Sequence, residues 1–288
     1  MQIFLPMKKT YFHVLFLLSL AMLTSCSDTV VVENRPDQSA TAPAIPGYFK
    51  KRALVEDYTG TWCGNCTRVS YAIELAKEQS DKVVSVAIHY GNDPYNFGAI
   101  PIAPLKNLIS PNAPLALPVS RLNRLNVWTF PETSNIQELI DLTGNNTTVG
   151  LAMSSTRNGS VIDLDVNVQF LDDYSDLKLV VYLLENHLMY FQRNYLEYYG
   201  GIDPIPVFEH NHVLRKPLTH ILGDDITDTT EGNTITKSFS YDLSTFTSPT
   251  PIDGDNVSFV AFLVGKDNKV INVRESHINE NQSFEINP

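Results

Sequence analysis

The feature that most constrains the fold of this chain is a cysteine pair, Cys63 and Cys66, set between two kinds of sequence pattern. Residues 53–58 before the pair (ALVEDY) read as a strand, whereas apolar residues from Thr67 to Gln79 recur at helical spacing. The run from Lys82 to Tyr90 (KVVSVAIHY) then reads as a buried strand. The sequence therefore predicts a strand, a W-C-x-x-C turn, a helix and a second strand in direct succession.

This placement gives the two cysteines different chemistry. At the entrance to a helix, unsatisfied N–H groups and the positive end of the helix dipole stabilise a thiolate. We therefore expect Cys63 to be the nucleophile and Cys66, one turn into the helix, to be the resolving thiol of a small disulfide ring. Arg68 would either add positive charge nearby or simply face water. The alternatives are a zinc half-site, which needs two further ligands, and a purely structural disulfide.

The order strand, W-C-x-x-C, helix, strand resembles the beginning of a thioredoxin-like domain. The resemblance implies that Asp57, six residues before Cys63, helps proton transfer to the resolving cysteine, and that Pro118 follows a cis peptide bond facing the pair. Strand alternation sends Glu56 and Asp57 to opposite faces, so only one of them can have that role, and both could instead flank the strand in solvent. Two other prolines, Pro111 and Pro114, compete with Pro118.

Asn65 departs from the thioredoxin pattern, in which proline precedes the second cysteine. The residues between the cysteines tune the stability of the thiolate and so the redox potential. Our hypothesis is that the pair is less reducing than that of thioredoxin.

The N-terminus has the parts of a secretory signal. Lys8 and Lys9 precede an apolar run from Val14 to Leu23 that is shorter than a membrane span. The following Leu-Thr-Ser-Cys resembles a lipobox, which implies cleavage after the first 25 residues and lipidation of Cys26. An ordinary signal peptide with a chance cysteine is the alternative. Residues 26–48, rich in proline and polar side chains, read as a flexible tether.

Beyond the tether, the pattern changes from mixed helix and strand to strand alone near residue 147. We therefore predict an α/β thioredoxin-like domain over residues 49–146, with an insertion at 91–117, followed by an all-β, immunoglobulin-like sandwich domain over residues 147–288. The expected helices after the first are Ala103–Ile109 and Thr133–Leu142. The expected strands of the second part are Val149–Ser155, Val161–Phe170, Leu177–Glu185, Glu209–Arg215, Thr234–Tyr241, Val257–Val264 and Val270–Glu275, with turns at Asn158-Gly159 and Lys266-Asp267-Asn268.

Two other segments have chemical potential. The aromatic stretch at residues 187–201 (HLMYFQRNYLEYYGG) could form a binding surface or pack between the two parts of the chain. The sequence His210-Asn211-His212 would put two imidazoles on one face of a strand, as in half of a metal site, or simply supply hydrogen-bonded histidines.

The net charge of −11 argues against nucleic acid as a partner, because phosphate binding requires clustered lysine and arginine. It also argues against electrostatic adhesion to anionic lipid. Neither of the partial ligand sets, the cysteine pair and the histidine pair, is complete, so we expect no bound cofactor and no resident metal. We therefore expect contact with the membrane only through the N-terminal lipid.

The lipobox at Cys26, the motif VEDYTGTWCGNC (Val55–Cys66) and the motif EHNHVLRK (Glu209–Lys216) together resemble the outer-membrane-protein-28-related lipoproteins of Bacteroidota. The resemblance implies a cell-envelope protein anchored by lipid at the outer membrane. We expect thiol–disulfide oxidoreductase activity with disulfides or thiols of envelope proteins as partners. The alternative is a non-catalytic binding or attachment lipoprotein in which Cys63 and Cys66 form a structural disulfide.

Overall fold

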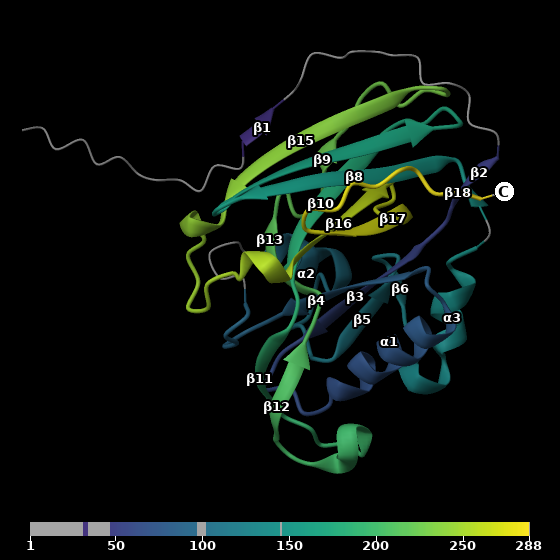
Figure 1. The fold of residues 1–288 in the computed structure, drawn as a ribbon. Coiled ribbons are helices and arrows are strands. Elements are labelled where there is room, and N and C mark those ends of the chain that lie inside the picture. The colour runs from purple at the N-terminus through teal and green to yellow at the C-terminus, as the bar shows by residue number, and fades with distance from the viewer. Residues whose placement is uncertain (1–30, 34–46, 97–101, 145, 288) are drawn as a thin grey trace, which may run out of the picture.

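The computed structural model describes residues 31–33, 47–96, 102–144 and 146–287. The signal sequence, Cys26 and most of the tether lie outside these residues. In the part that is described, strands outnumber helices, and the long strands come from both halves of the chain (Figure 1).

The main sheet runs through both halves of the chain. Within the described residues it has nine strands, in the order β17-β16-β10-β13-β4-β3-β5-β6, with β14 beside β10. Only the pairings of β4 with β3 and with β13 are parallel. The strands are β3 (Ala53–Thr59), β4 (Val83–His89), β5 (Val119–Leu122), β6 (Asn126–Val127), β10 (Lys178–Glu185), β13 (Val213–Pro217), β14 (Asp224–Asp225), β16 (Val257–Val264) and β17 (Val270–His277).

A second sheet covers one end of this main sheet and has the order β1-β15-β9-β8. Its strands are β1 (Val31–Glu33), β15 (Thr234–Asp242), β9 (Val161–Phe170) and β8 (Val149–Asn158). Two small sheets complete the described structure: the hairpin of β11 (Leu188–Gln192) and β12 (Ile205–His210), and the group of β18 (Ile286–Asn287), β2 (Tyr48–Lys50) and β7 (Asn146–Thr147).

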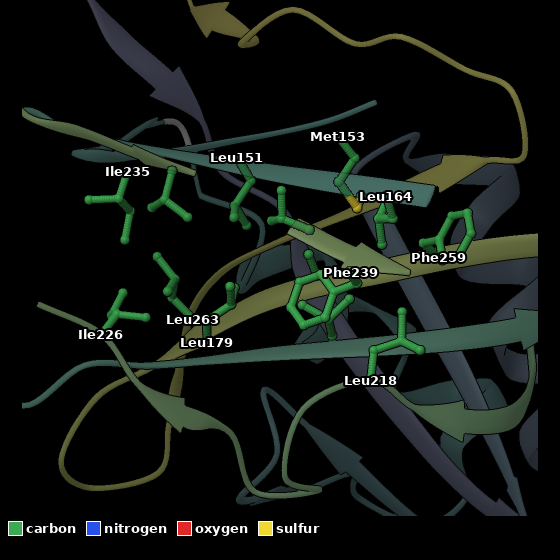
Figure 2. Close-up of a cluster of buried hydrophobic side chains, with 14 of the residues drawn as sticks. Leu151, Met153, Leu164, Leu179, Leu218, Ile226, Ile235, Phe239, Phe259 and Leu263 are labelled. Atoms are coloured by element: carbon green, nitrogen blue, oxygen red, sulfur yellow. The ribbon is translucent and has the colours of Figure 1, made fainter. Parts of the chain in front are cut away.

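The largest apolar core lies between the two large sheets. Side chains from β8, β9 and β15 meet those of β10 and β16, as Figure 2 shows for Leu151, Leu164 and Phe239 against Leu179 and Phe259. Burial of these apolar side chains is the main force that holds the sheets together.

Helices cover the other end of the main sheet. They are α1 (Thr67–Gln79), α2 (Ala103–Ile109) and α3 (Ile136–Asp141), with short 3₁₀ turns η1 (Glu132–Ser134), η2 (Tyr198–Gly201), η3 (Leu243–Thr245) and η4 (Gly254–Asn256). The apolar stripe of α1, which includes Val69, Ala72 and Ala76, packs on β3 and β4, whereas Leu105 of α2 belongs to the core on the opposite face. None of the described helices is long and apolar enough to span a membrane.

The predicted fold class, an α/β thioredoxin-like domain followed by an all-β immunoglobulin-like sandwich, is wrong. The structure is mostly β-sheet, and β3, β4 and β5 are strands of the same sheet as β10, β13, β16 and β17. The physical reason lies in β10 and β16. All eight residues of β16 are buried, as are seven of eight in β10, so both faces of each strand are covered. A two-layer sandwich strand has one solvated face, and these runs lack the alternation that such a face requires.

Most individual elements were nevertheless predicted correctly. The helices Thr67–Gln79 and Ala103–Ile109 and the strands Val161–Phe170 and Val257–Val264 have the predicted bounds. Two expected elements are each split in two. Helix 133–142 becomes η1 and α3, separated at Asn135, and strand 209–215 becomes β12 and β13, separated where His212 adopts a φ of 55°.

Candidate functional site

Cys63 and Cys66 form a disulfide that precedes α1, with their Cα atoms 5.4 Å apart. Cys66 is the N-cap residue of α1, so the helix begins one residue after the pair and Cys63 lies a turn before it. The Cys66 carbonyl accepts the Val69 N–H at 3.0 Å, which ties Cys66 to the first turn of the helix. Cys63 is 5% exposed and Cys66 1%, so both cysteines are nearly closed off from solvent.

Arg68 does not offer a free positive charge to the disulfide. Its Nε lies 2.5 Å from Glu132 Oε2, and its guanidinium stacks 4.5 Å from the centre of the Phe130 ring. The ion pair is nearly buried on both sides, so its charges largely neutralise each other. Arg68 is therefore not the free positive charge beside the cysteine pair that the sequence suggested.

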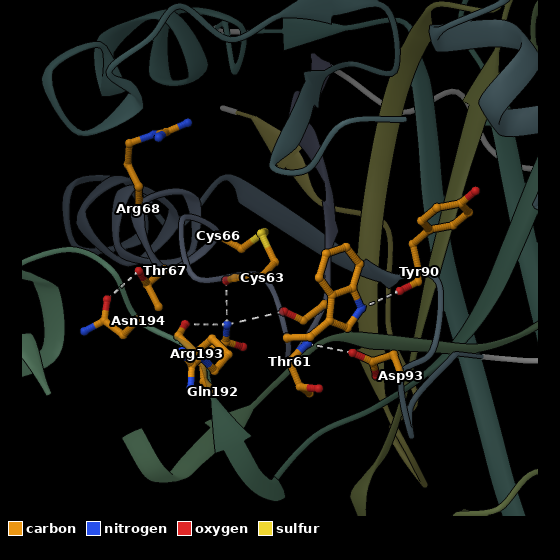
Figure 3. Close-up of a disulfide and its surroundings, with 12 residues drawn as sticks. Thr61, Cys63, Cys66, Thr67, Arg68, Tyr90, Asp93, Gln192, Arg193 and Asn194 are labelled. Carbon is orange, nitrogen blue, oxygen red and sulfur yellow. Dashed lines mark hydrogen bonds between the residues drawn. A yellow bond between two sulfur atoms is a disulfide. The ribbon is translucent and has the colours of Figure 1, made fainter. Parts of the chain in front are cut away.

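The loop before the disulfide is bound to the end of β4. The indole N–H of Trp62 donates to the Tyr90 carbonyl at 3.1 Å, and the Thr61 N–H donates to Asp93 Oδ2 at 2.6 Å (Figure 3). Trp62 is nonetheless 44% exposed, which leaves an aromatic surface next to Cys63.

A segment from the second half of the chain, Gln192–Tyr195, closes over the disulfide loop, and we call it the clasp. The Arg193 N–H donates to the Thr61 carbonyl and the Tyr195 N–H to the Gly64 carbonyl, both at 2.8 Å. The buried Gln192 side chain donates to the carbonyls of Gly60, at 3.3 Å, and Cys63, at 3.0 Å (Figure 3). The W-C-x-x-C loop is thus held by backbone bonds to a distant part of the chain.

The rest of the aromatic segment also lies at this site. Tyr198 and Tyr199 pack against Tyr71 of α1, with ring centres 4.9 and 5.7 Å from that of Tyr71, the Tyr199 ring edge-on. By contrast, Met189 and Tyr195 are 55% and 61% exposed. Some rings of residues 187–201 therefore pack on α1, as one interpretation expected, whereas the interpretation of this segment as a binding surface stays a prediction.

Asp57 and Glu56 lie on opposite faces of β3, and both are buried, so they do not flank the strand in solvent. Glu56 faces away from α1, where Arg124 Nη2 contacts its Oε1 at 3.4 Å and also donates to the Tyr182 hydroxyl. Asp57 faces the helix side and lines a cavity together with Ser70 of α1. The acid on the side of the disulfide is therefore Asp57.

Asp57 is held in an environment that disfavours its charge. It is 3% exposed, and its Oδ1 has no hydrogen-bond partner among the described residues. Burial raises the pKa of Asp57 to about 8, with a further increase from the negative charge of Glu132 and a decrease from Arg68. At neutral pH this carboxyl is therefore able both to give and to take a proton.

The Leu117–Pro118 peptide bond is cis, whereas Pro111 and Pro114 are not among the cis prolines of the described residues. Pro118 immediately precedes β5, and β5 pairs with β3 such that Val119 lies opposite Tyr58. Pro118 is thus at the end of β3 from which the disulfide loop departs. The other described cis bonds are Phe130–Pro131 and Asp203–Pro204.

The histidines of His210-Asn211-His212 do not share one strand face. His210 is the last residue of β12 and stacks on His89, with ring centres 5.4 Å apart. His212 turns away, and its Nδ1 lies 3.1 Å from Glu275 and its Nε2 2.8 Å from the Lys77 ammonium. In the described part of the chain, His, Cys, Asp and Glu side chains form no group of three or more that could hold a metal ion.

Several residues of the site were missed from the sequence. Gln192 bonds the disulfide loop, Glu132 pairs with Arg68, and Ser85 lines the cavity of Asp57. None of these three residues belongs to a recognisable local motif. The density of aromatic residues around Gln192 was the one available signal for the clasp.

Comparison with known proteins identifies the family. Residues 114–282, more than half of the chain, match the family model described as outer membrane protein Omp28. Among solved structures, HBP35 of Porphyromonas gingivalis superposes with a TM-score of 0.61 at 17% identity, over 82% of this chain and 78% of that one, and so has a similar fold. A crystal structure of a domain of the outer membrane lipoprotein Omp28 from Porphyromonas gingivalis gives a TM-score of 0.30 at 16% identity, over 47% of this chain and 92% of that one. A search of curated proteins gave no match. The chain belongs to the Omp28 family of outer-membrane proteins, which supports a location in the bacterial cell envelope.

Proposed function

We propose that this protein is a cell-envelope lipoprotein that exchanges disulfides with other envelope proteins through Cys63 and Cys66. The Cys63 thiolate attacks one sulfur of a partner disulfide, and the other partner sulfur leaves with the electron pair and takes up a proton. The Cys66 thiolate then attacks Cys63, which forms the Cys63–Cys66 bond and releases the partner as a dithiol. The partner gains two electrons that the pair loses, and the reverse sequence oxidises a partner dithiol.

The observation that carries this proposal is the buried Asp57. A buried carboxyl with an unpaired oxygen lowers the stability of the folded state. A purely structural disulfide does not need a buried carboxyl beside it. Thiol exchange, by contrast, requires a group near the resolving thiol that can donate and accept a proton. Asp57 lines a cavity with Ser70, whose N–H bonds the Cys66 carbonyl at 3.3 Å, so the acid lies on the same side of the sheet as the first turn of α1.

The order of exposure agrees with the assigned roles. Cys63, the proposed nucleophile, is the more exposed of the two cysteines and follows the exposed Trp62. Cys66, the proposed resolving thiol, is buried at the start of α1. A partner would thus reach Cys63 first.

A second candidate function is binding or surface attachment, with Cys63–Cys66 as a structural staple. The clasp favours this candidate, because Gln192 and Arg193 bond the disulfide loop and leave the pair little exposed. Under this interpretation the staple would hold the loop in the shape that the clasp recognises.

We also propose that the protein is anchored by lipid on Cys26. The Leu-Thr-Ser-Cys sequence after an apolar run supports this proposal, as does membership in an outer-membrane protein family. Acyl chains on one cysteine give stable anchoring, since each buried CH₂ contributes about 0.8 kcal/mol.

Trapping of mixed disulfides in intact cells tests the exchange proposal. The Cys66→Ser variant is expected to accumulate covalent adducts with envelope proteins, because the mixed disulfide at Cys63 is not resolved. The matched control is the double variant with Cys63→Ser added, in which the adducts should disappear on a non-reducing gel. If the single and double variants show the same bands, the structural staple is the better account.

A further inference from the structure

One face of the main sheet changes character along β3 and β4. Near their beginnings, Val55 and Val83 pack under the apolar stripe of α1. Further along the same face come Asp57 and Thr59 of β3 and Ser85, Ala87 and His89 of β4, all of which line one cavity. Here the cover passes from α1 to β12, which contributes Phe208 and His210. The cavity has a volume of about 150 Å³.

Three polar atoms of this cavity lack a partner. Asp57 Oδ1, Ser85 Oγ and His210 Nε2 are buried and make no hydrogen bond to any described residue. The three residues are 3%, 3% and 6% exposed. Buried polar atoms in folded proteins are almost always satisfied by protein or by ordered water. Three such atoms around one cavity indicate a polar occupant.

The protonation of His210 determines which hydrogen bonds the occupant of the cavity must make. The ring bonds the Phe191 carbonyl, and burial lowers the pKa of His210 to about 3, with an additional decrease from His89. The imidazole is therefore neutral, and Nε2 is a bare acceptor. Ser85 both donates and accepts, and Asp57 does either according to its protonation. Water, which donates two hydrogen bonds and accepts two, fits all three groups.

The dimensions also fit water. A water molecule takes up about 30 Å³ in the liquid, so the cavity has room for several molecules in contact with one another. Its rim includes Glu74 of α1 and Glu209 of β12, which are exposed. A connected row of water molecules can therefore run from Asp57 to bulk solvent between the helix and the hairpin.

We propose that this cavity holds ordered water that carries protons between Asp57 and solvent, with Ser85 and His210 as the residues that position it. The inference rests on the proposed exchange function. When a thiolate attacks Cys63, the Cys63–Cys66 bond breaks and Cys66 leaves with the electron pair. The Asp57 carboxyl gives its proton to Cys66, and the resulting carboxylate takes a proton from solvent through the water in the cavity. In the opposite direction, Asp57 takes the proton of Cys66 and releases it by the same route.

Charged and titratable groups line this cavity or act electrostatically on Asp57 from the elements around it. They are Arg68, Glu74 and Lys77 of α1, Glu132 of η1, His89 of β4, Tyr199 of η2, Glu209 and His210 of β12, and His212 after β12. Ser85 and His210 each have an unpaired atom in this cavity and carry no charge at neutral pH. Their replacement therefore changes the hydrogen bonds to the water and leaves the surrounding charges in place.

The first test is a carbon-13 NMR titration of Asp57 in the full, disulfide-bonded chain in detergent, with Asp57→Asn to assign the signal. The His210→Phe variant keeps an aromatic ring against His89 but loses the Nε2 acceptor for water. The Asp57 carboxylate is then solvated less well. We expect the pKa of Asp57 to rise by about 1 or more. Ser85→Ala, which removes only a hydroxyl, should shift it in the same direction. His277→Phe, on an exposed histidine of β17, is the matched control and should leave the titration unchanged.

The second test is the rate at which dithiothreitol reduces the disulfide as a function of pH. The profile of the unaltered protein should follow the Asp57 titration, and the profile of His210→Phe should move with it. Neither readout uses a partner protein, so both can succeed even if Cys66→Ser traps no adduct. Identical Asp57 titrations in the unaltered protein, His210→Phe and Ser85→Ala would overturn the proposal, as would pH profiles of reduction that do not follow Asp57.

Discussion

The ring of Tyr195 occupies the space that any side chain at position 64 would need. A Cβ atom added to Gly64 would clash with the Tyr195 ring, and the Tyr195 N–H donates to the Gly64 carbonyl at 2.8 Å. The glycine of the W-C-G-N-C motif therefore allows the clasp to approach the disulfide loop. This contact joins the two halves of the chain at the candidate site.

Replacement of Gly64 by alanine should force the Tyr195 ring away from the disulfide loop. We expect a loss of about 1–3 kcal/mol in the free energy of unfolding, as for other overpacked sites. Denaturant unfolding of Gly64→Ala measures this loss. In a Tyr195→Ala background the same substitution should have a much smaller effect, and an equal effect in both backgrounds would contradict the proposed contact.

Loss of the Gln192 amide should loosen the clasp. In Gln192→Leu, the carbonyls of Gly60 and Cys63 lose a buried donor, which is expected to destabilise the protein by about 1–3 kcal/mol. After mild reduction, Cys63 should also react faster with iodoacetamide. The exposed Gln137→Leu is the matched control, expected to change stability by no more than about 0.5 kcal/mol. An alkylation rate in Gln192→Leu equal to that of the control would show that the clasp does not protect Cys63.

Asp57 should make the protein less stable as the pH rises. Its pKa goes from 3.8, the ordinary value, to about 8 in the folded state, so the folded protein binds more protons than the unfolded chain between these values. The free energy of unfolding should fall by up to about 1.4 kcal/mol for each pH unit in this window and level off above it. Asp57→Asn should remove this slope. Urea unfolding of both proteins at pH 5 and pH 8 measures the difference, and parallel losses in the two proteins would argue against a raised pKa.

Lipid attachment at Cys26 predicts a change in cell fractionation. With Cys26→Ser, the protein should no longer incorporate labelled fatty acid and should be held less firmly in the membrane fraction, because the acyl chains on that cysteine are the proposed anchor. Fatty-acid labelling with fractionation of the envelope is the measurement. Retention of the fatty-acid label in Cys26→Ser would contradict lipid attachment at Cys26.

Local patterns predicted the elements well, because each pattern reports the burial of its own residues. The stripe of α1 and the alternation in Val161–Phe170 depend only on which faces of those segments are covered. They do not say which strands pair. Val213 pairs with Ala87 across more than a hundred residues, and this pairing joins the second half of the chain to β4. The fold class was wrong because that pairing is not recorded in the pattern of either strand, and because the unbroken apolar runs of β10 and β16 were interpreted as strands of a sandwich.

The candidate site divides in the same way. Cys63, Cys66, Asp57 and Pro118 were predicted because they have a recognisable spacing around one strand and one helix. Gln192 was not predicted, because it bonds the disulfide loop, which lies more than a hundred residues earlier in the sequence. Similarly, His210 was considered as a metal ligand, whereas the structure places its Nε2 at a cavity shared with Asp57.

The reduction potential of the Cys63–Cys66 pair tests the central proposal most directly. It is measured by equilibration with glutathione or dithiothreitol buffers, together with the alkylation rate of Cys63 against pH. The account predicts a potential well above about −300 mV, and above the roughly −270 mV of thioredoxin, with a Cys63 that reacts rapidly near neutral pH. A potential below about −300 mV with a slowly reacting Cys63 would contradict it and make the disulfide a structural staple.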